Sequence, residues 1–166
     1  MQPKLQRRPD TGETMVKRKS LTEDYCPSAR SLDVIGDWWS LLIVRDAFDG
    51  LTRFGEFQKS LGIAKNILSE RLKTLVARGI LKSVPAADGG AHQEYHLTEM
   101  GRDLFPVMVA LRKFGEAHLF APGEPHSRLV ERETGQAIQL EIRTSDGRAV
   151  DAKDAVILKV EEDGAA

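Results

Sequence analysis

The chain has one cysteine in 166 residues and no long run of apolar residues. A single cysteine excludes an intrachain disulfide and argues against a cysteine-based zinc site. A membrane-spanning helix needs about 20 consecutive apolar residues, which the sequence does not contain. The N-terminus has basic residues with no apolar segment behind them, unlike a secretory signal. These absences predict a cytoplasmic protein that has no membrane partner, no metal and no cofactor.

Arrangements typical of catalysis are also missing. The sequence shows no Ser-His-Asp set, no phosphate-binding loop, no paired carboxylates and no His-rich metal motif. Asp33 and Asp37 are one helical turn apart, but each stands near an expected helix end. An enzyme is therefore not expected.

A formal net charge of −1 conceals an uneven distribution of charge. Residues 59–82 hold six basic residues against one acidic residue, and residues 1–19 hold six against two. Residues 121–166 hold six basic and ten acidic residues. Because local charge governs attraction to phosphates more than total charge does, residues 59–82 suit a nucleic-acid partner. The alternative is chance clustering.

The most informative segment is residues 65–78, which predicts an amphipathic helix between Gly62 and Gly79. Its apolar residues recur at helical spacing and form one stripe: Leu68, Leu72, Leu75 and Val76. The opposite face carries Asn66, Ser69, Glu70 and Lys73, with Lys65 and Arg71 toward its edges. Such side chains can contact base edges or phosphates in a DNA major groove. An ordinary solvated surface helix is the alternative.

The surrounding pattern predicts helices over residues 27–35, 38–48 and 53–61, with Asp37 and Thr52 as caps of the second and third. Strands are expected over 80–84 and 94–97, and Thr98 is expected to cap a long helix that reaches Phe120. This order predicts a mainly α-helical (α+β) winged helix-turn-helix fold, with a C-terminal dimerisation helix and a short β-rich extension. The hairpin over 82–97 is the wing. His92 and Gln93 stand beside its Gly89-Gly90 tip and could touch DNA, the alternative being a plain hairpin loop.

Five segments carry a family resemblance: residues 26–27, 32–39, 53–57, 68–75 and 95–101. In this order they resemble the HxlR-type, MarR-like transcriptional regulators of bacteria. The resemblance implies a sequence-specific, dimeric protein that binds double-stranded DNA, with some members activating and others repressing. It places five residues of the recognition helix against DNA: Lys65, Asn66, Ser69, Glu70 and Lys73. Arg71 lies nearer the helix flank, where it could grip a phosphate or pair with an acid.

One position departs from a common form of this family. Ala64 stands where a hydroxyl or proline often precedes the recognition helix, so the cap must come from elsewhere. A Ser or Thr cap is worth about 0.5–2 kcal/mol. The start of the helix is therefore expected to be looser.

The last helix carries a broad apolar stripe: Leu104, Val107, Met108, Leu111 and Phe114. We expect one side of it to pack inward and the other to meet a twofold partner, although core burial alone is the alternative. In a homodimer, two recognition helices about 34 Å apart would read a palindromic operator. The sequence leaves open whether a small-molecule effector also binds.

Cys26 precedes Pro27 at a helix N-terminus, where free N–H groups and the helix dipole favour a thiolate. Arg30 follows one turn later. The thiol could sense electrophiles or oxidants, as a matching cysteine does in some relatives of this type. The alternative is a small residue packed under the helix.

Three regions result. Residues 1–25 are expected to form a flexible basic arm, and residues 26–122 the DNA-binding and dimerisation domain. Residues 123–166 are expected to form an acidic, metal-free β-hairpin packed against the body or a partner. The alternative function is a winged-helix module for protein–protein contact without DNA binding.

Overall fold

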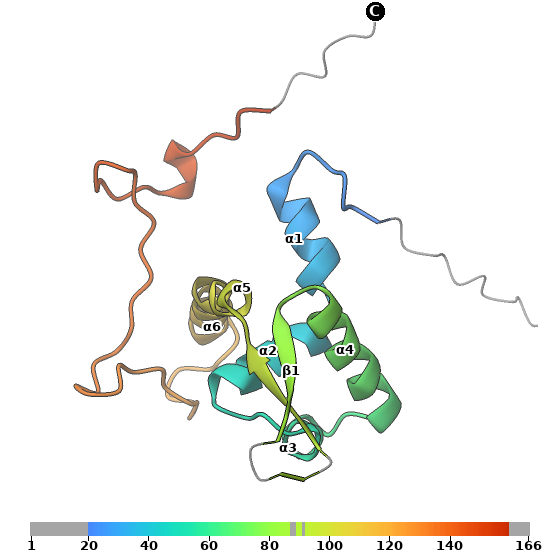
Figure 1. Cartoon of the computed structure of the whole chain (residues 1–166). Coiled ribbons are helices and arrows are strands. Elements are labelled where there is room, and N and C mark those ends of the chain that lie inside the picture. Colours follow the sequence, from blue (N-terminus) through green and yellow to red (C-terminus); the bar gives the residue numbers. More distant parts are fainter. Residues whose placement is uncertain (1–19, 87–88, 91, 160–166) are drawn as a thin grey trace, which may run out of the picture.

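The computed structural model describes residues 20–86, 89–90 and 92–159 (Figure 1). It contains the helices α1 (Pro27–Ile35), α2 (Trp38–Phe48), α3 (Phe54–Leu61), α4 (Lys65–Ala77), α5 (Glu99–Arg102) and α6 (Phe105–His118). The two strands are β1 (Leu81–Pro85) and β2 (Gln93–Leu97), and a 3₁₀ turn, η1, spans Ala152–Asp154. This is the predicted winged helix-turn-helix order. Within the described ranges, no helix has the length and apolar character needed to cross a membrane.

The core lies where α2, α3 and α4 meet the base of the hairpin. The largest side chains that are fully buried there are Ile43, Val44, Phe57, Leu68, Leu72, Leu75, Ile80 and Leu81. Tyr95 and Leu97 of β2 pack against this cluster. The core thus holds α4 by its leucine face and leaves the opposite face exposed.

The helix ends follow local hydrogen bonding. Asp37 caps α2 as predicted, because its Oδ1 accepts from the Ser40 amide at 3.1 Å. Thr52 is not the cap of α3. Instead the Glu56 carboxylate accepts from the amides of Thr52 and Arg53, each at 2.9 Å. These two hydrogen bonds hold the pKa of Glu56 below its usual value.

The predicted long helix from Thr98 to Phe120 is wrong in one respect, because it is broken in two. Thr98 caps only the short helix α5, accepting from the Gly101 amide at 3.0 Å. Pro106 lies in the first turn of α6. Its ring would clash with the carbonyl of Arg102, and it has no N–H to donate, so the helix cannot run through. The predicted helix therefore consists of two helices, α5 and α6.

The end of the expected flexible arm is held in place. Ser20 and Thr22 donate their hydroxyls to Asp33 Oδ2, both at 3.2 Å, and the Leu21 amide donates to Asp33 Oδ1 at 3.1 Å. The Leu21 amide is the main cause that lowers the pKa of Asp33. Residues 20–25 therefore fold back on α1, whereas residues 1–19 lie outside the described part.

The extension differs from the predicted pair of strands. Its antiparallel pairing is limited to two single bridges, Val130 with Ala137 and Arg143 with Ala149. Each bridge closes a turn at a glycine of positive φ, Gly135 (69°) or Gly147 (89°). The turns were predicted, but each folds on its own neighbours, so between residues 123 and 159 no longer ladder forms.

Candidate nucleic-acid interface

Helices α3 and α4 form the angled pair of the helix-turn-helix. Gly62 ends α3 with φ at +61°, a left-handed conformation that suits glycine. Ile63 is buried beneath the turn, and α4 begins at Lys65 after Ala64. Ala64 offers no side-chain cap, as predicted, so the first amides of α4 remain available to another acceptor.

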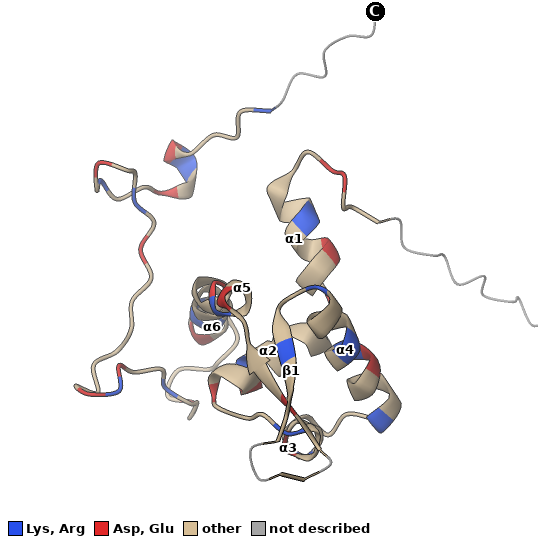
Figure 2. Ribbon diagram, in the orientation of Figure 1, with Lys and Arg blue, Asp and Glu red and all other residues tan. Residues whose placement is uncertain are grey.

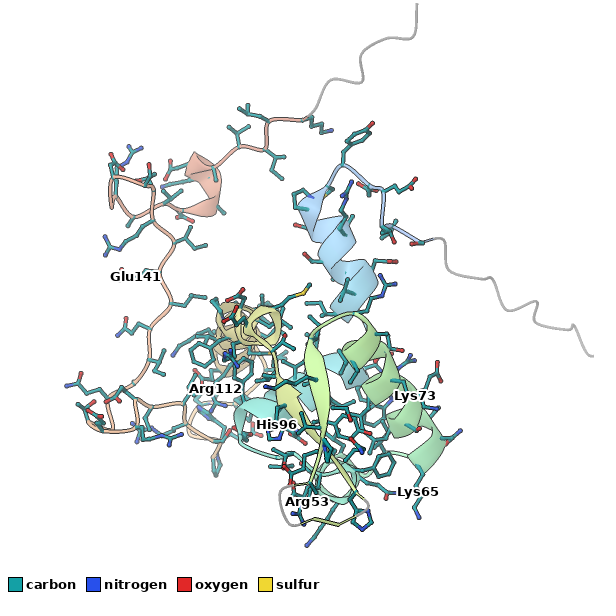
Figure 3. All side chains as sticks on the ribbon, viewed as in Figure 1. Arg53, Lys65, Lys73, His96, Arg112 and Glu141 are labelled. Atoms are coloured by element: carbon teal, nitrogen blue, oxygen red, sulfur yellow. The ribbon has the colours of Figure 1, made fainter. Side chains whose placement is uncertain are left out.

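The outer face of α4 is exposed and basic. Lys65, Asn66, Glu70 and Lys73 are exposed, and Ser69 is half-buried. Figure 3 shows Lys65 and Lys73 along the outer side of α4, and Figure 2 shows the basic residues spread along this helix. Within the described part of the chain, the side chains of Lys65, Asn66 and Lys73 form no hydrogen bond or ion pair. They are therefore available to a ligand.

Arg71 takes the second of its two predicted options and pairs with an acid. Its Nε lies 2.6 Å from Oδ2 of Asp37, the residue that caps α2. The N–H is not aligned for a hydrogen bond, so the contact is an ion pair. Arg71 also lies 3.5 Å from the Glu70 carboxylate. Arg71 thus ties α4 to α2 and orients the recognition helix.

The wing is the antiparallel pair β1–β2, in which Leu81 lies opposite Leu97 and Pro85 opposite Gln93. His92 and Gln93 are exposed at its outer end, and the His92 carbonyl accepts from the Ala86 amide at 3.0 Å. The Gln93 side chain accepts from the Ser83 hydroxyl at 3.1 Å. Asp88, the neighbour of Gly89 at the expected tip, lies outside the described residues. The wing therefore places two polar side chains beside α3.

Arg53 is a candidate contact that sequence reasoning missed. It stands just before α3 and pairs with Glu94 of β2 at 3.3 Å, across 41 positions of sequence. With Lys59, His92 and Gln93 it lines a groove of about 620 Å³ between α3 and the wing. Figure 3 shows Arg53 at the wing end of the molecule, on the side where Lys65 begins α4. Only the folded hairpin brings Arg53 to His92, so no local pattern could have revealed it.

The expected dimerisation stripe on α6 is divided by the fold. Leu104 and Met108 pack against the hydrophobic core. Val107, Leu111 and Phe114 are 40%, 47% and 59% exposed. The outward side of α6 is therefore a stripe of three large apolar residues that the described chain does not cover.

Cys26 is exposed and free, and it occupies the N-cap position of α1. Its amide donates to Asp24 Oδ1 at 2.8 Å. Arg30, one turn after Cys26, donates to the Asp24 carbonyl. The Cys26 thiol is therefore accessible, while the guanidinium of Arg30 is hydrogen-bonded to the backbone of Asp24.

An exposed basic helix on a helix-turn-helix, next to a wing, defines the class of winged helix-turn-helix proteins. Within this class, residues 34–121 match the HxlR-like helix-turn-helix family, and the chain belongs to that family. It is 41% identical over 107 residues to the uncharacterized HTH-type transcriptional regulator Rv3095 of Mycobacterium tuberculosis, covering 64% of this chain and 68% of that protein. The chain is thus a transcriptional regulator of the helix-turn-helix type.

Solved structures agree with this family. PA1607, assigned as a transcription factor, has a TM-score of 0.80 and 57% identity, covering 84% of this chain and 99% of that one. The oxidized form of the redox regulator HypR has a TM-score of 0.53 and 33% identity, covering 58% of this chain and all of HypR. The match to PA1607 covers 84% of this chain, which is more than residues 1–122 make up, so the match includes part of the extension.

Proposed function

We propose that the chain binds double-stranded DNA as a homodimer, with α4 of each copy in the major groove. The observation that carries this proposal is the outer face of α4, where Lys65, Asn66 and Lys73 are exposed without a described protein partner while the leucines opposite are buried. The major groove is wide enough to admit an α-helix. A helix buried by one face can therefore present its polar face to the bases and phosphates. A regulator of this kind acts on the DNA of the producing cell, so we place it in the cytoplasm.

The residue types suggest separate roles at the interface. The Asn66 amide suits a bidentate contact with adenine, and Glu70 could accept from a cytosine amino group. Lys65, Lys73 and Ser69 suit phosphates or base edges, and Arg71 orients the helix through Asp37. His92 and Gln93 would reach the flanking backbone from the wing. A twofold dimer would then recognise a palindrome with half-sites about 34 Å apart.

A salt titration with genomic DNA tests this function. The purified chain should hold genomic fragments on a filter. Its affinity should fall steeply between 50 and 200 mM salt, because phosphate contacts release counterions. Each contact adds about 0.9 to the slope of log affinity against log salt concentration. Random DNA should bind more weakly at both salt concentrations. Absence of binding to either DNA would contradict the proposal and favour a protein–protein module.

We further propose that Cys26 makes the regulator responsive to thiol reagents. HypR, a similar protein, is a redox regulator solved in reduced and oxidized forms. With a single cysteine per chain, two thiols from two copies would form a disulfide while diamide takes up their hydrogens and becomes a hydrazine. A quinone would instead add the sulfur at a ring carbon and receive the thiol proton on its oxygen.

Cys26→Ser should remove the response of DNA binding to diamide or a quinone. In the wild type, we expect these reagents to change DNA affinity by several-fold, and dithiothreitol to reverse the effect of diamide. The double variant Cys26→Ser/Ser28→Cys keeps one thiol per chain on the same helical turn and should not respond. A normal response of Cys26→Ser would locate the sensor elsewhere.

A further inference from the structure

The extension is anchored to α6 and then leaves the body. Arg112 of α6 donates to the carbonyl and hydroxyl oxygens of Ser127, the latter at 3.0 Å, and pairs with Glu116 at 2.8 Å. Leu129 is half-buried at the edge of α2 and α6. Beyond this root, residues 139–159, here called the C-terminal arm, run apart from the helices (Figure 1). The Arg112–Ser127 contacts therefore hold the root of the arm, while, among the described residues, its far part lies away from the helices.

The arm has a defined local shape. Thr144 and Arg148 close its turn through amide and hydroxyl hydrogen bonds, and the Val150 amide donates to the Ile142 carbonyl at 2.9 Å. Within the described chain, every hydrogen bond and ion pair given for residues 139–159 stays inside the arm. A single short hairpin is marginal in water unless another surface supports it. The arm therefore needs a surface that the described monomer does not provide.

The composition of the arm supports this need. Its exposed large apolar residues are Leu140, Ile142, Val156, Ile157 and Leu158, the last three being 82%, 84% and 88% exposed. Extended apolar segments of this kind on a soluble chain mark an interaction surface. Figure 3 shows Glu141, between two of these residues, on the arm and apart from Arg112 at its root.

The body carries a matching apolar groove. The groove, of about 660 Å³, lies between α2 and α6 and is lined by Trp38, Leu41, Leu42, Phe48, Met108 and Leu111, among others. Leu111 also belongs to the exposed stripe of α6, so the groove opens at the edge of the surface expected to meet the second copy. The arm root, held by Arg112, and the groove, lined by Leu111, therefore both border α6.

We propose that the two copies exchange their C-terminal arms, each arm lying across the α2–α6 groove of the other copy. With the turn at residues 142–150 closed, residues 139–141 and 151–159 still span up to about 40 Å, at about 3.3 Å per residue, which is enough to cross a domain of this size. Twofold symmetry makes the exchange reciprocal. This inference rests on the dimer of the proposed function, and it extends that dimer beyond α6.

Photo-crosslinking in a mixed-isotope dimer tests the exchange. Benzoylphenylalanine replaces Ile142 in the full chain, and the dimer is formed from equal amounts of ¹⁴N- and ¹⁵N-labelled copies. We expect about half of the cross-linked peptide pairs to join a light arm to a heavy body or the reverse, at residues 38–49 or 105–112. Pairs that join only equal isotopes would show that the arm covers its own body, and would overturn the proposal.

A second measurement uses substitutions in the full chain. Leu140→Asp/Ile142→Asp should weaken dimerisation about tenfold or more in sedimentation, because two apolar contacts are lost in each copy. Glu141→Gln, the matched control on the intervening position, should leave dimerisation unchanged. Unchanged association of the double variant would contradict the exchange. A wild-type chain that sediments as a monomer would instead contradict the dimer of the proposed function.

Discussion

Replacing Lys65, Asn66 and Lys73 together by alanine is expected to abolish specific DNA binding and leave the fold intact. A lost bidentate base contact costs about 1–3 kcal/mol in each half-site, or roughly 5- to 150-fold in affinity. Loss of two lysines from each copy removes up to four phosphate contacts, which should lower the logarithmic salt slope by about 3.6. Filter binding with genomic fragments retained by the wild type, at two salt concentrations, measures both effects.

The single variants separate these two contributions. Asn66→Ala should reduce the preference for genomic over random DNA and change the salt slope little, whereas Lys65→Ala and Lys73→Ala should lower affinity for both DNAs. Arg132→Ala removes the same charge from an exposed turn outside both α4 and the C-terminal arm, and serves as the matched control. All three side chains are exposed, so the melting temperature should stay close to that of the wild type. Unchanged affinity of the triple variant would remove α4 from the interface.

The recognition helix was predictable because its own residues decide it. Leu68, Leu72 and Leu75 repeat at helical spacing, and burying them in the core leaves Asn66 and Lys73 outside. Asp37 likewise caps α2 through a hydrogen bond to a residue only three positions away in the sequence. Where the local pattern and the tertiary packing agree, the sequence alone was enough to predict the element.

Contacts between distant residues were not predictable in the same way. The Arg71–Asp37 ion pair and the Arg53–Glu94 ion pair both depend on how helices and hairpin pack. The anchoring of residues 20–22 on Asp33 is another long-range contact, in a segment without apolar periodicity. The resemblance left Arg71 with two roles, and only the folded helices distinguish them.

The break between α5 and α6 had a local signal that the apolar stripe obscured. The stripe from Leu104 to Phe114 continues through Pro106, although a proline inside a helix removes a hydrogen bond and clashes with the preceding turn. The extension posed the opposite problem, because its turns were readable while their pairing was not. Each of its two glycine turns closes on adjacent residues, and the side chains of Glu131 and Thr144 accept the turn amides.

Replacing Leu111 by aspartate is expected to convert the proposed dimer into monomers. Leu111 is 47% exposed on the outward side of α6, between Val107 and Phe114. Burying a leucine stabilises by about 1.5–3 kcal/mol, and twofold symmetry places the substitution twice in one interface. A carboxylate without a partner adds a desolvation cost of several kcal/mol. Sedimentation across a range of protein concentrations measures the change.

Loss of the dimer should also weaken binding to a palindromic operator. Two linked half-sites gain about 10²–10⁴-fold in avidity over one, and a monomer forfeits this gain. Leu111→Met keeps the volume and apolar character and should behave as the wild type. Circular dichroism should show unchanged helix content for both variants, because Leu111 lies outside the buried core. Leu111→Asp chains that remain dimeric would move the interface away from the exposed stripe of α6.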